Sequence, residues 1–290
     1  MKKCLLCGQS KYSAKIAYNN KFGWPVLYCK KCELGYTGED DAKIKKAYKQ
    51  YYSGEYWHSR KARKNITGTG LRQSVFRHGV KALRFMGVHP LIAISHHEML
   101  KEWIRAQDKG SATRFLEIGP GEGHSLRYFS NFYDVSAIEP DKKNCQKINK
   151  RLGKKACKAG DIETDPIKGK FDVIYLSHVF EHLVYPLRFL NTVKNNLAKG
   201  GIIFIEVPNC ANPSMKKSST MENETHTFHY TSESLRNIFT KAGLRIVDLG
   251  VYSPLTYNPA KATWRSIRRI PSYRKANDKE GMNIVMIAKR

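Results

Sequence analysis

The chain has 290 residues, of which 41% are hydrophobic and 11% aromatic, so it is too apolar for a disordered protein and long enough for one α/β domain plus a small module. Its 51 lysine and arginine residues outnumber 25 acidic residues, for a formal net charge of +26. This excess indicates an anionic partner or substrate: nucleic acid, a phosphorylated or nucleotide-linked small molecule, or a membrane surface. Lysine-rich solvated faces are the alternative explanation.

The sequence contains no apolar run of the roughly 18 residues that a transmembrane helix needs, and it opens on a cysteine motif instead of a secretory signal. We therefore expect a cytoplasmic protein without a transmembrane segment. Four of its seven cysteines form two pairs, Cys4-x-x-Cys7 and Cys29-x-x-Cys32. This spacing predicts a zinc ribbon over residues 1–39, with short strands at 15–18 and 25–28. A closed four-cysteine site leaves no position for water, so we expect its zinc to be structural.

Residues 40–107 are predicted to form a helical linker that borders the substrate site. Asp40 or Asp41 can begin a first helix, and apolar spacings of three and four residues predict further helices at 75–86 and 91–107. Two segments free of acidic residues but rich in basic ones, 56–97 and 249–277, lie on either side of the remaining core.

From residue 108 to the end, strands and helices alternate, which predicts a Rossmann-like α/β domain with a seven-stranded sheet and helices on both faces. We expect strands at 114–118, 134–138, 171–176 and 201–207. Helices are expected at 124–131, 142–152 and 186–197, with another beginning at 231–235. Strands at 244–252 and 283–288 are predicted to form an antiparallel hairpin at the sheet edge.

A glycine-rich loop, Glu117-Ile-Gly119-Pro120-Gly121-Glu-Gly123, leaves the first of these strands and enters a helix. Glycines allow a tight turn and a close approach of the backbone to a ligand, at the edge where open α/β sheets bind cofactors. The spacing G-x-G-x-G differs from the G-x-G-x-x-G of dinucleotide-binding loops. The carboxylate of Glu117 would repel a pyrophosphate, but it suits a nucleotide-type cofactor with a cationic amino-acid end.

Acidic residues also follow the next two strands. Glu139 stands 20 residues after Gly119, in position to accept hydrogen bonds from both ribose hydroxyls. Asp161 follows the position where a third strand should end, with Ile162 beside it to pack on an adenine ring. Three acids in register with the glycines therefore predict one cofactor site.

These motifs make the chain similar to the class I S-adenosylmethionine-dependent methyltransferases, and more narrowly to zinc-ribbon members associated with saccharide and surface-polysaccharide modification. The resemblance covers nearly the whole chain through the two cysteine pairs, Tyr51-Tyr52-Ser-Gly-Glu-Tyr56-Trp57, the glycine loop, Ser177-His178-Val-Phe-Glu181-His182-Leu, Gly200-Gly201, Val207-Pro208-Asn209 and His229-Tyr230-Thr-Ser-Glu-Ser-Leu235. It implies cofactor contacts at Glu117, Gly119, Pro120, Gly121, Gly123, Glu139, Pro140, Asp161, Ile162, Ser177 and His178.

The candidate catalytic residues are His178, Glu181, His182 and His229. Methyl transfer from a sulfonium is an in-line displacement, so an enzyme aligns the reactants and removes a proton. A histidine suits that proton transfer because its pKa lies near neutrality. One hypothesis is therefore that His182 or His178 acts as a general base. Histidines with only structural hydrogen bonds are a further interpretation.

A second divalent metal site at His178, Glu181 and His182 is the other hypothesis. The H-x-x-E-H arrangement resembles the E-x-x-E-H motif of metal-dependent methyltransferases of the small-RNA 2′-O-methylating and quinone-biosynthesis types, which also use a distant histidine. This sequence has His178 where they carry a glutamate. The departure argues against magnesium, because hard cations prefer oxygen ligands.

The function that we expect is O-methylation of a sugar hydroxyl, on a nucleotide-linked, phosphorylated or glycan acceptor. Related sugar C-methyltransferases carry a large additional carboxy-terminal domain for which this chain is too short, so O-transfer is favoured over C-transfer. An RNA methyltransferase, including a metal-assisted 2′-O enzyme, is the alternative that the net charge of +26 supports. A non-catalytic, zinc-stapled binding protein is the third class.

Overall fold

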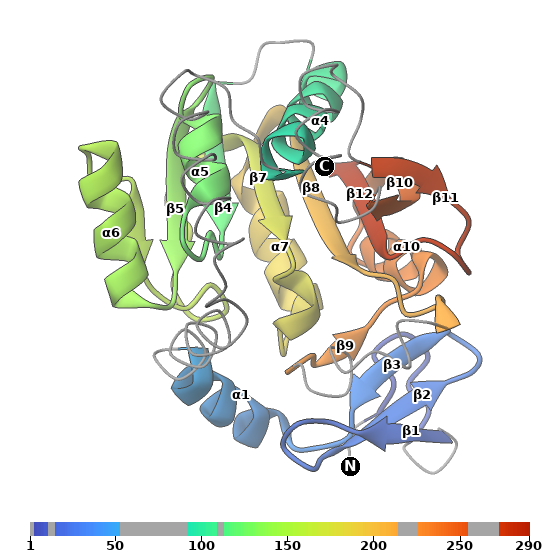
Figure 1. Cartoon of the computed structure of the whole chain (residues 1–290). Coiled ribbons are helices and arrows are strands. Elements are labelled where there is room, and N and C mark those ends of the chain that lie inside the picture. The colour runs from blue at the N-terminus through green and yellow to red at the C-terminus, as the bar shows by residue number, and fades with distance from the viewer. Residues whose placement is uncertain (1–2, 11–14, 53–91, 109–112, 214–224, 255–272) are drawn as a thin grey trace, which may run out of the picture.

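The computed structural model describes residues 3–10, 15–52, 92–108, 113–213, 225–254 and 273–290 (Figure 1). The helix predicted at 75–86 and most of both basic segments lie outside these residues. Within the described helices, none is long and apolar enough to cross a membrane.

The larger of two sheets has eight strands in the order β11-β10-β12-β8-β7-β4-β5-β6. From β8 to β6 neighbouring strands are parallel, and from β8 to β11 they are antiparallel. The strands are β4 (Arg114–Ile118), β5 (Asp134–Glu139), β6 (Cys157–Ala159), β7 (Phe171–Ser177), β8 (Leu197–Pro208), β10 (Arg245–Pro254), β11 (Tyr273–Ala276) and β12 (Asn283–Lys289). Every strand predicted for this domain is present, so the α/β fold is confirmed.

The eighth strand, β11, corrects the prediction of seven. Strand β10 continues past the predicted residue 252 to Pro254, and its last four residues pair with β11. The predicted antiparallel pair of β10 and β12 is present, but β12 lies inside the sheet between β10 and β8. The edge therefore belongs to β11, a four-residue strand with two adjacent basic residues and no buried residue, which gave no strong strand signal.

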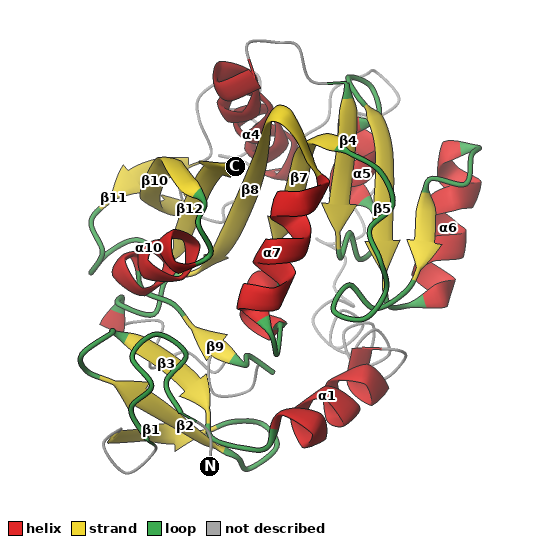
Figure 2. Cartoon of the chain, turned by 180° about the vertical axis from the view of Figure 1, so that it is seen from behind, coloured by secondary structure: helices red, strands yellow, loops and turns green. Residues whose placement is uncertain are grey.

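Helices cover both faces of this sheet (Figures 1 and 2). Adjacent residues of one strand point to opposite faces: Phe115 packs in one apolar cluster, whereas Leu116 packs in the other. The cluster around Phe115 is covered by α4 (Ile92–Asp108), α5 (His124–Phe129) and α6 (Lys142–Leu152). The cluster around Leu116 is covered by α7 (Pro186–Asn196) and α10 (Ser232–Lys241).

The amino-terminal module forms a second, four-stranded antiparallel sheet of β1 (Lys15–Asn19), β2 (Pro25–Cys29), β3 (Leu34–Thr37) and β9 (Phe228–His229). Strand β9 comes from the α/β part of the chain, so the two parts share one sheet. Helix α1 (Asp41–Gln50) follows, and the Asp40 side chain caps it by accepting from the N–H groups of Ala42 and Lys43. This sheet and α1 lie beyond the carboxyl ends of the parallel strands (Figure 1).

Candidate functional site

The glycine loop turns from β4 into α5 through left-handed backbone conformations. Gly119 has φ 66° and Gly123 has φ 74°, both in the region that side chains disfavour. A Cβ atom at Gly119 would lie 2.7 Å from Cγ2 of Val179, and one at Gly123 would lie 2.5 Å from Cγ1 of Ile148. The loop therefore requires glycine at both positions, for conformation and for space.

Glu139 ties this loop to the end of β5. Its side chain is buried, and its carboxylate accepts hydrogen bonds from the N–H groups of Gly121 (2.9 Å) and Asp141 (3.0 Å). Burial raises the pKa of Glu139 to about 7, although the two backbone donors oppose this shift. A carboxylate has about four lone-pair positions, so Glu139 retains acceptor capacity for ribose hydroxyls.

Glu117 presents a buried carboxylate beside the same loop. Its Oε1 accepts a hydrogen bond from the Ser125 hydroxyl, and its Oε2 has no hydrogen-bond partner among the described residues. Burial raises the pKa of Glu117 to about 8, and the Ser125 hydrogen bond partly offsets the shift. A buried carboxylate is stable when it meets a cationic partner. The residues therefore fit a cofactor whose cationic amino-acid end lies next to the loop.

The remaining predicted cofactor residues follow β5, β6 and β7. Asp161 accepts the N–H of Glu163 at 2.9 Å, its other oxygen lies 3.5 Å from the Lys45 ammonium, and Ile162 packs against the core. The Ser177 hydroxyl donates to the Glu206 carboxylate at 2.8 Å. Pro120 is buried and Pro140 is exposed. The predicted residues thus gather along the carboxyl edge of the parallel strands.

A further buried carboxylate, Glu181, lies in the short 3-10 helix η3 (Phe180–His182) that follows β7. Only 1% of Glu181 is exposed, and neither of its carboxylate oxygens has a hydrogen-bond partner among the described residues. Its Oε1 lies 3.6 Å from Nδ1 of His178 and 3.9 Å from Nε2 of both His182 and His226. These distances exceed hydrogen-bond length, so three imidazoles face a carboxylate without bonding to it.

The orientation of His182 is fixed from its far side. Its Nδ1 lies 3.0 Å from the Thr225 carbonyl oxygen and 2.9 Å from the Tyr52 hydroxyl, which also contacts the Thr225 hydroxyl. A carbonyl only accepts, so the proton of a neutral His182 is on Nδ1. Nε2 then directs its lone pair toward Glu181.

The other two histidines of this region differ in their surroundings. His226 is buried, and this burial lowers its pKa well below the usual value. The neighbouring histidines lower the pKa further, so the ring is neutral. His229 is also buried, its Nδ1 lies 3.2 Å from the Tyr18 hydroxyl, and burial lowers its pKa to about 3. The ligand atoms of Glu181, His182 and His226 all lie within 4.8 Å of one another. His229 is outside that group and faces the amino-terminal sheet.

The family model described as "Methyltransferase domain" matches residues 92–249, more than half of the chain. The chain belongs to this methyltransferase family. It is an enzyme that uses S-adenosylmethionine, so the alternative of a non-catalytic binding protein is wrong. No curated protein sequence matches the chain.

Solved structures with a similar fold include three methyltransferases. An S-adenosylmethionine-dependent methyltransferase from Clostridium acetobutylicum is 14% identical, with a TM-score of 0.49, covering 75% of this chain and 98% of its own. A SAM-dependent methyltransferase from Archaeoglobus fulgidus is 17% identical, with a TM-score of 0.49 and coverages of 67% and 94%. The N-methyltransferase NodS from Bradyrhizobium japonicum, in complex with S-adenosyl-L-homocysteine, is 14% identical, with a TM-score of 0.48 and coverages of 69% and 87%.

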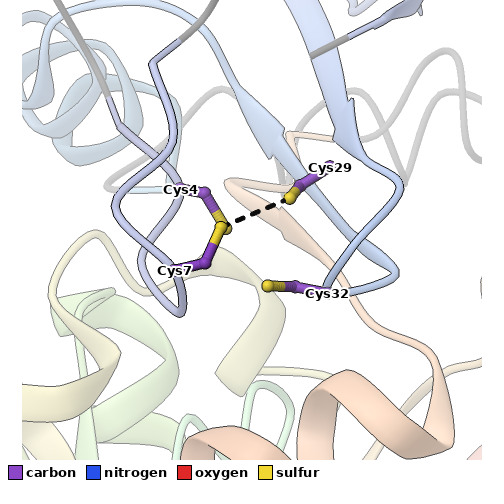
Figure 3. A group of neighbouring side chains, drawn as sticks. All are labelled: Cys4, Cys7, Cys29 and Cys32. Atoms are coloured by element: carbon purple, nitrogen blue, oxygen red, sulfur yellow. Dashed lines mark hydrogen bonds between the residues drawn. The ribbon is translucent and has the colours of Figure 1, made fainter. Parts of the chain in front are cut away.

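The four paired cysteines of this methyltransferase converge in the amino-terminal module (Figure 3). The Sγ atoms of Cys4, Cys7, Cys29 and Cys32 lie within 4.8 Å of one another, and those of Cys7 and Cys29 are 3.6 Å apart. Tetrahedral zinc at about 2.3 Å from each sulfur separates the sulfurs by about 3.8 Å. Burial opposes ionisation of Cys7, but hydrogen bonds from Gln9 and the neighbouring cysteines outweigh it and lower the pKa to about 7. The arrangement fits a zinc ion.

The cysteine module also supports the histidine segment of the methyltransferase. The Thr37 N–H donates to the Thr227 carbonyl at 2.8 Å, and the Thr37 hydroxyl donates to the His226 carbonyl at 2.9 Å. Gly35 pairs with His229 in the strand ladder. Lys241 of α10 donates to the backbone carbonyls of the first cysteine loop, at 3.0 and 3.2 Å. The positions of His226 and His229 therefore depend on the amino-terminal strands.

The structure brings together Glu181 and His182 as the sequence predicted, and it places His226 in their cluster instead of His229. His178 has φ 54° and a side chain that is 46% exposed, next to Glu181. Tyr52 and Thr225 were not among the predicted site residues, and of the two histidines at 226 and 229 the prediction named His229. The adjacent tyrosines at 51 and 52 could have indicated Tyr52 from the sequence. Thr225 accepts through its backbone carbonyl, which every residue has, so the sequence could not have indicated it.

Proposed function

We propose that this methyltransferase acts on the hydroxyl of a sugar in a nucleotide-linked, phosphorylated or glycan acceptor, and that its four cysteines hold a structural zinc ion. The observation that carries the proposal is the buried Glu181 faced by three imidazoles at the carboxyl edge of the sheet. A sugar hydroxyl keeps its proton at neutral pH. Its methylation therefore needs a group that accepts this proton or stabilises the alkoxide that remains. A histidine and carboxylate cluster supplies such chemistry.

The roles that we propose for the cofactor residues follow the order of the strands that they terminate. Glu117 holds the cationic amino-acid end of the cofactor, Glu139 the ribose, and Asp161 with Ile162 the adenine. S-adenosylmethionine, when bound, supplies a methyl group on a positively charged sulfur. His182 or His178 receives the hydroxyl proton, and the buried carboxylate of Glu181 lies 3.9 and 3.6 Å from their ring nitrogens.

Two further observations support a large anionic acceptor and a substrate site beside the linker. The formal charge of +26 favours phosphate- or uronate-bearing acceptors over neutral ones. Tyr52, from the segment at 40–107, reaches the imidazole of His182 at 2.9 Å. We therefore propose that this segment borders the acceptor, and that the domain boundaries lie near residues 39 and 107.

The test is transfer of labelled methyl from S-adenosylmethionine to three acceptor pools: nucleotide sugars, an anionic polysaccharide extract and total RNA. We expect label in a saccharide pool, and loss of that label in His182→Ala with binding of S-adenosyl-L-homocysteine retained. The retained binding serves as the control for folding and for the cofactor site. Label in RNA alone would overturn the sugar assignment and favour the RNA methyltransferase, whose support is the net charge.

A further inference from the structure

We propose that Glu181, His182 and His226 bind one divalent ion of a first-row transition metal, at a site separate from the four cysteines. The first observation is the state of Glu181. Both carboxylate oxygens are buried and lack a hydrogen-bond partner among the described residues. An isolated buried carboxylate is strongly unfavourable unless a cation or several donors compensate for its lost hydration, so this side chain requires a partner at the position that the imidazoles face.

The second observation is the spacing of the nitrogen and oxygen atoms. Nε2 of His182 and Nε2 of His226 each lie 3.9 Å from Oε1 of Glu181. This separation is too long for a hydrogen bond. Ligands about 2.1 Å from a shared ion, subtending angles of about 110 to 140°, are separated by about 3.4 to 3.9 Å. Each imidazole nitrogen therefore has a ligand-like separation from the carboxylate oxygen, and all three ligand atoms lie within 4.8 Å of one another.

The third observation concerns the groups behind the ligands. A histidine that binds metal through Nε2 commonly donates its Nδ1–H to a carbonyl or carboxylate, which fixes the tautomer and the ring plane. His182 makes this contact with the Thr225 carbonyl at 3.0 Å. The carbonyl of His226 accepts from the Thr37 hydroxyl at 2.9 Å, so the backbone of the third ligand is held by β3. The ring of His182 and the backbone of His226 are thereby positioned before any ion arrives.

The ligand chemistry selects the class of ion. Two imidazoles and one carboxylate suit zinc, iron, cobalt, nickel or manganese, whereas magnesium and calcium prefer all-oxygen sites. Three protein ligands leave coordination positions open. His178 lies on the exposed side, with its Nδ1 3.6 Å from Glu181 and its side chain 46% exposed. We assign it as the proton acceptor beside the ion, not as a ligand.

The consequence for catalysis rests on the proposed function. An acceptor hydroxyl in an open coordination position loses its proton more readily, because the ion stabilises the alkoxide. That oxygen then forms the new C–O bond while the C–S bond of the sulfonium breaks. The sulfur keeps the bonding electron pair and becomes a thioether, and the hydroxyl proton passes to His178 and then to water. The products are the methyl ether, S-adenosyl-L-homocysteine and a proton.

The experiment is a Co²⁺ titration of protein whose four cysteines are already loaded with zinc, followed by calorimetry and by visible absorption. We expect one Co²⁺ per chain, with the weak bands of nitrogen and oxygen ligands and without the intense bands of thiolate coordination. Glu181→Gln and His226→Gln should weaken binding by about 100-fold or more, and Tyr52→Phe by about tenfold. Glu233→Gln is the matched control, since Glu233 is exposed on α10 and should leave binding unchanged.

Three results would overturn the site: no Co²⁺ beyond the cysteine site, displacement of Co²⁺ by equimolar Mg²⁺, or unchanged binding in Glu181→Gln. If Glu181→Gln does not fold, the number of Co²⁺ ions bound per wild-type chain and their visible spectrum test the site. His226→Gln then provides the second variant. Metal binding and methyl transfer are read separately. Binding without transfer to sugars upholds the site and refutes the sugar acceptor, whereas transfer without a second metal refutes the site alone.

Discussion

Replacement of Gly119 by alanine tests whether the cofactor loop is fixed by space as well as by backbone conformation. Gly119 and Gly153 share φ 66°, but a Cβ atom at Gly119 would lie 2.7 Å from Cγ2 of Val179, whereas one at Gly153 would meet nothing within 4 Å. The left-handed conformation costs an alanine about 1–2 kcal/mol at either position. The gain from a less flexible unfolded chain is also common to both variants.

The steric overlap should therefore make Gly119→Ala less stable than Gly153→Ala. Overpacking costs about 1–3 kcal/mol, so Gly119→Ala should lose about 2–5 kcal/mol of unfolding free energy, compared with about 1–2 kcal/mol for Gly153→Ala. Because Val179 follows His178, its displacement should also weaken binding of S-adenosyl-L-homocysteine in Gly119→Ala. Urea denaturation measures the first quantity and calorimetry the second.

Val179→Ala in the Gly119→Ala background should recover much of the difference, because it removes the atom that is contacted. Equal losses of unfolding free energy in Gly119→Ala and Gly153→Ala would refute the steric explanation. The loop would then be governed by backbone conformation alone.

Three further predictions concern pH, the cysteines and the shared sheet. The pKa values of Glu117 and Glu139 are raised from 4.5 to about 8 and about 7, so their contribution to stability is present below pH 4.5 and is lost as the pH rises through 7 to 8. Urea denaturation without cofactor should follow this fall in unfolding free energy, and Glu117→Gln should flatten it; a profile identical to the wild type would contradict the assignment. Cys29→Ser should lower the melting temperature and also reduce methyl transfer, since β3 pairs with β9; reduced stability with undiminished transfer at a permissive temperature would argue against the coupling. Gly35→Ala would place a Cβ atom 2.8 Å from the His229 Cβ, so methyl transfer should fall while zinc content, measured by elemental analysis, stays at the wild-type level; unchanged transfer would show that β9 tolerates displacement.

The strand and helix pattern was accessible from sequence because it depends on local periodicity. The bounds of β4 and α6 agree with the predicted ranges 114–118 and 142–152, where the last four strand residues are all buried and Asp141 caps the helix. The glycine loop with Glu117 and Glu139 was accessible for a similar reason. Their spacing along the chain follows from the length of one strand, one helix and the next strand.

The eighth strand and the shared sheet were not accessible in this way. Strand β11 has intermediate and exposed residues with no apolar face, and β9 has only two residues. Both exist because a neighbouring strand offers unpaired backbone donors and acceptors, which is a property of the folded molecule.

The sequence by itself determined the α/β fold, the cofactor loop and the convergence of four cysteines, because each is encoded in residues at fixed local spacing. Only the tertiary structure decided which histidine accompanies Glu181. His226 and His229 are three residues apart and chemically alike, yet His226 faces the carboxylate and His229 faces Tyr18. The choice is made by the pairing of β9 with β3, which sets the direction of each side chain through contacts between segments almost 200 residues apart.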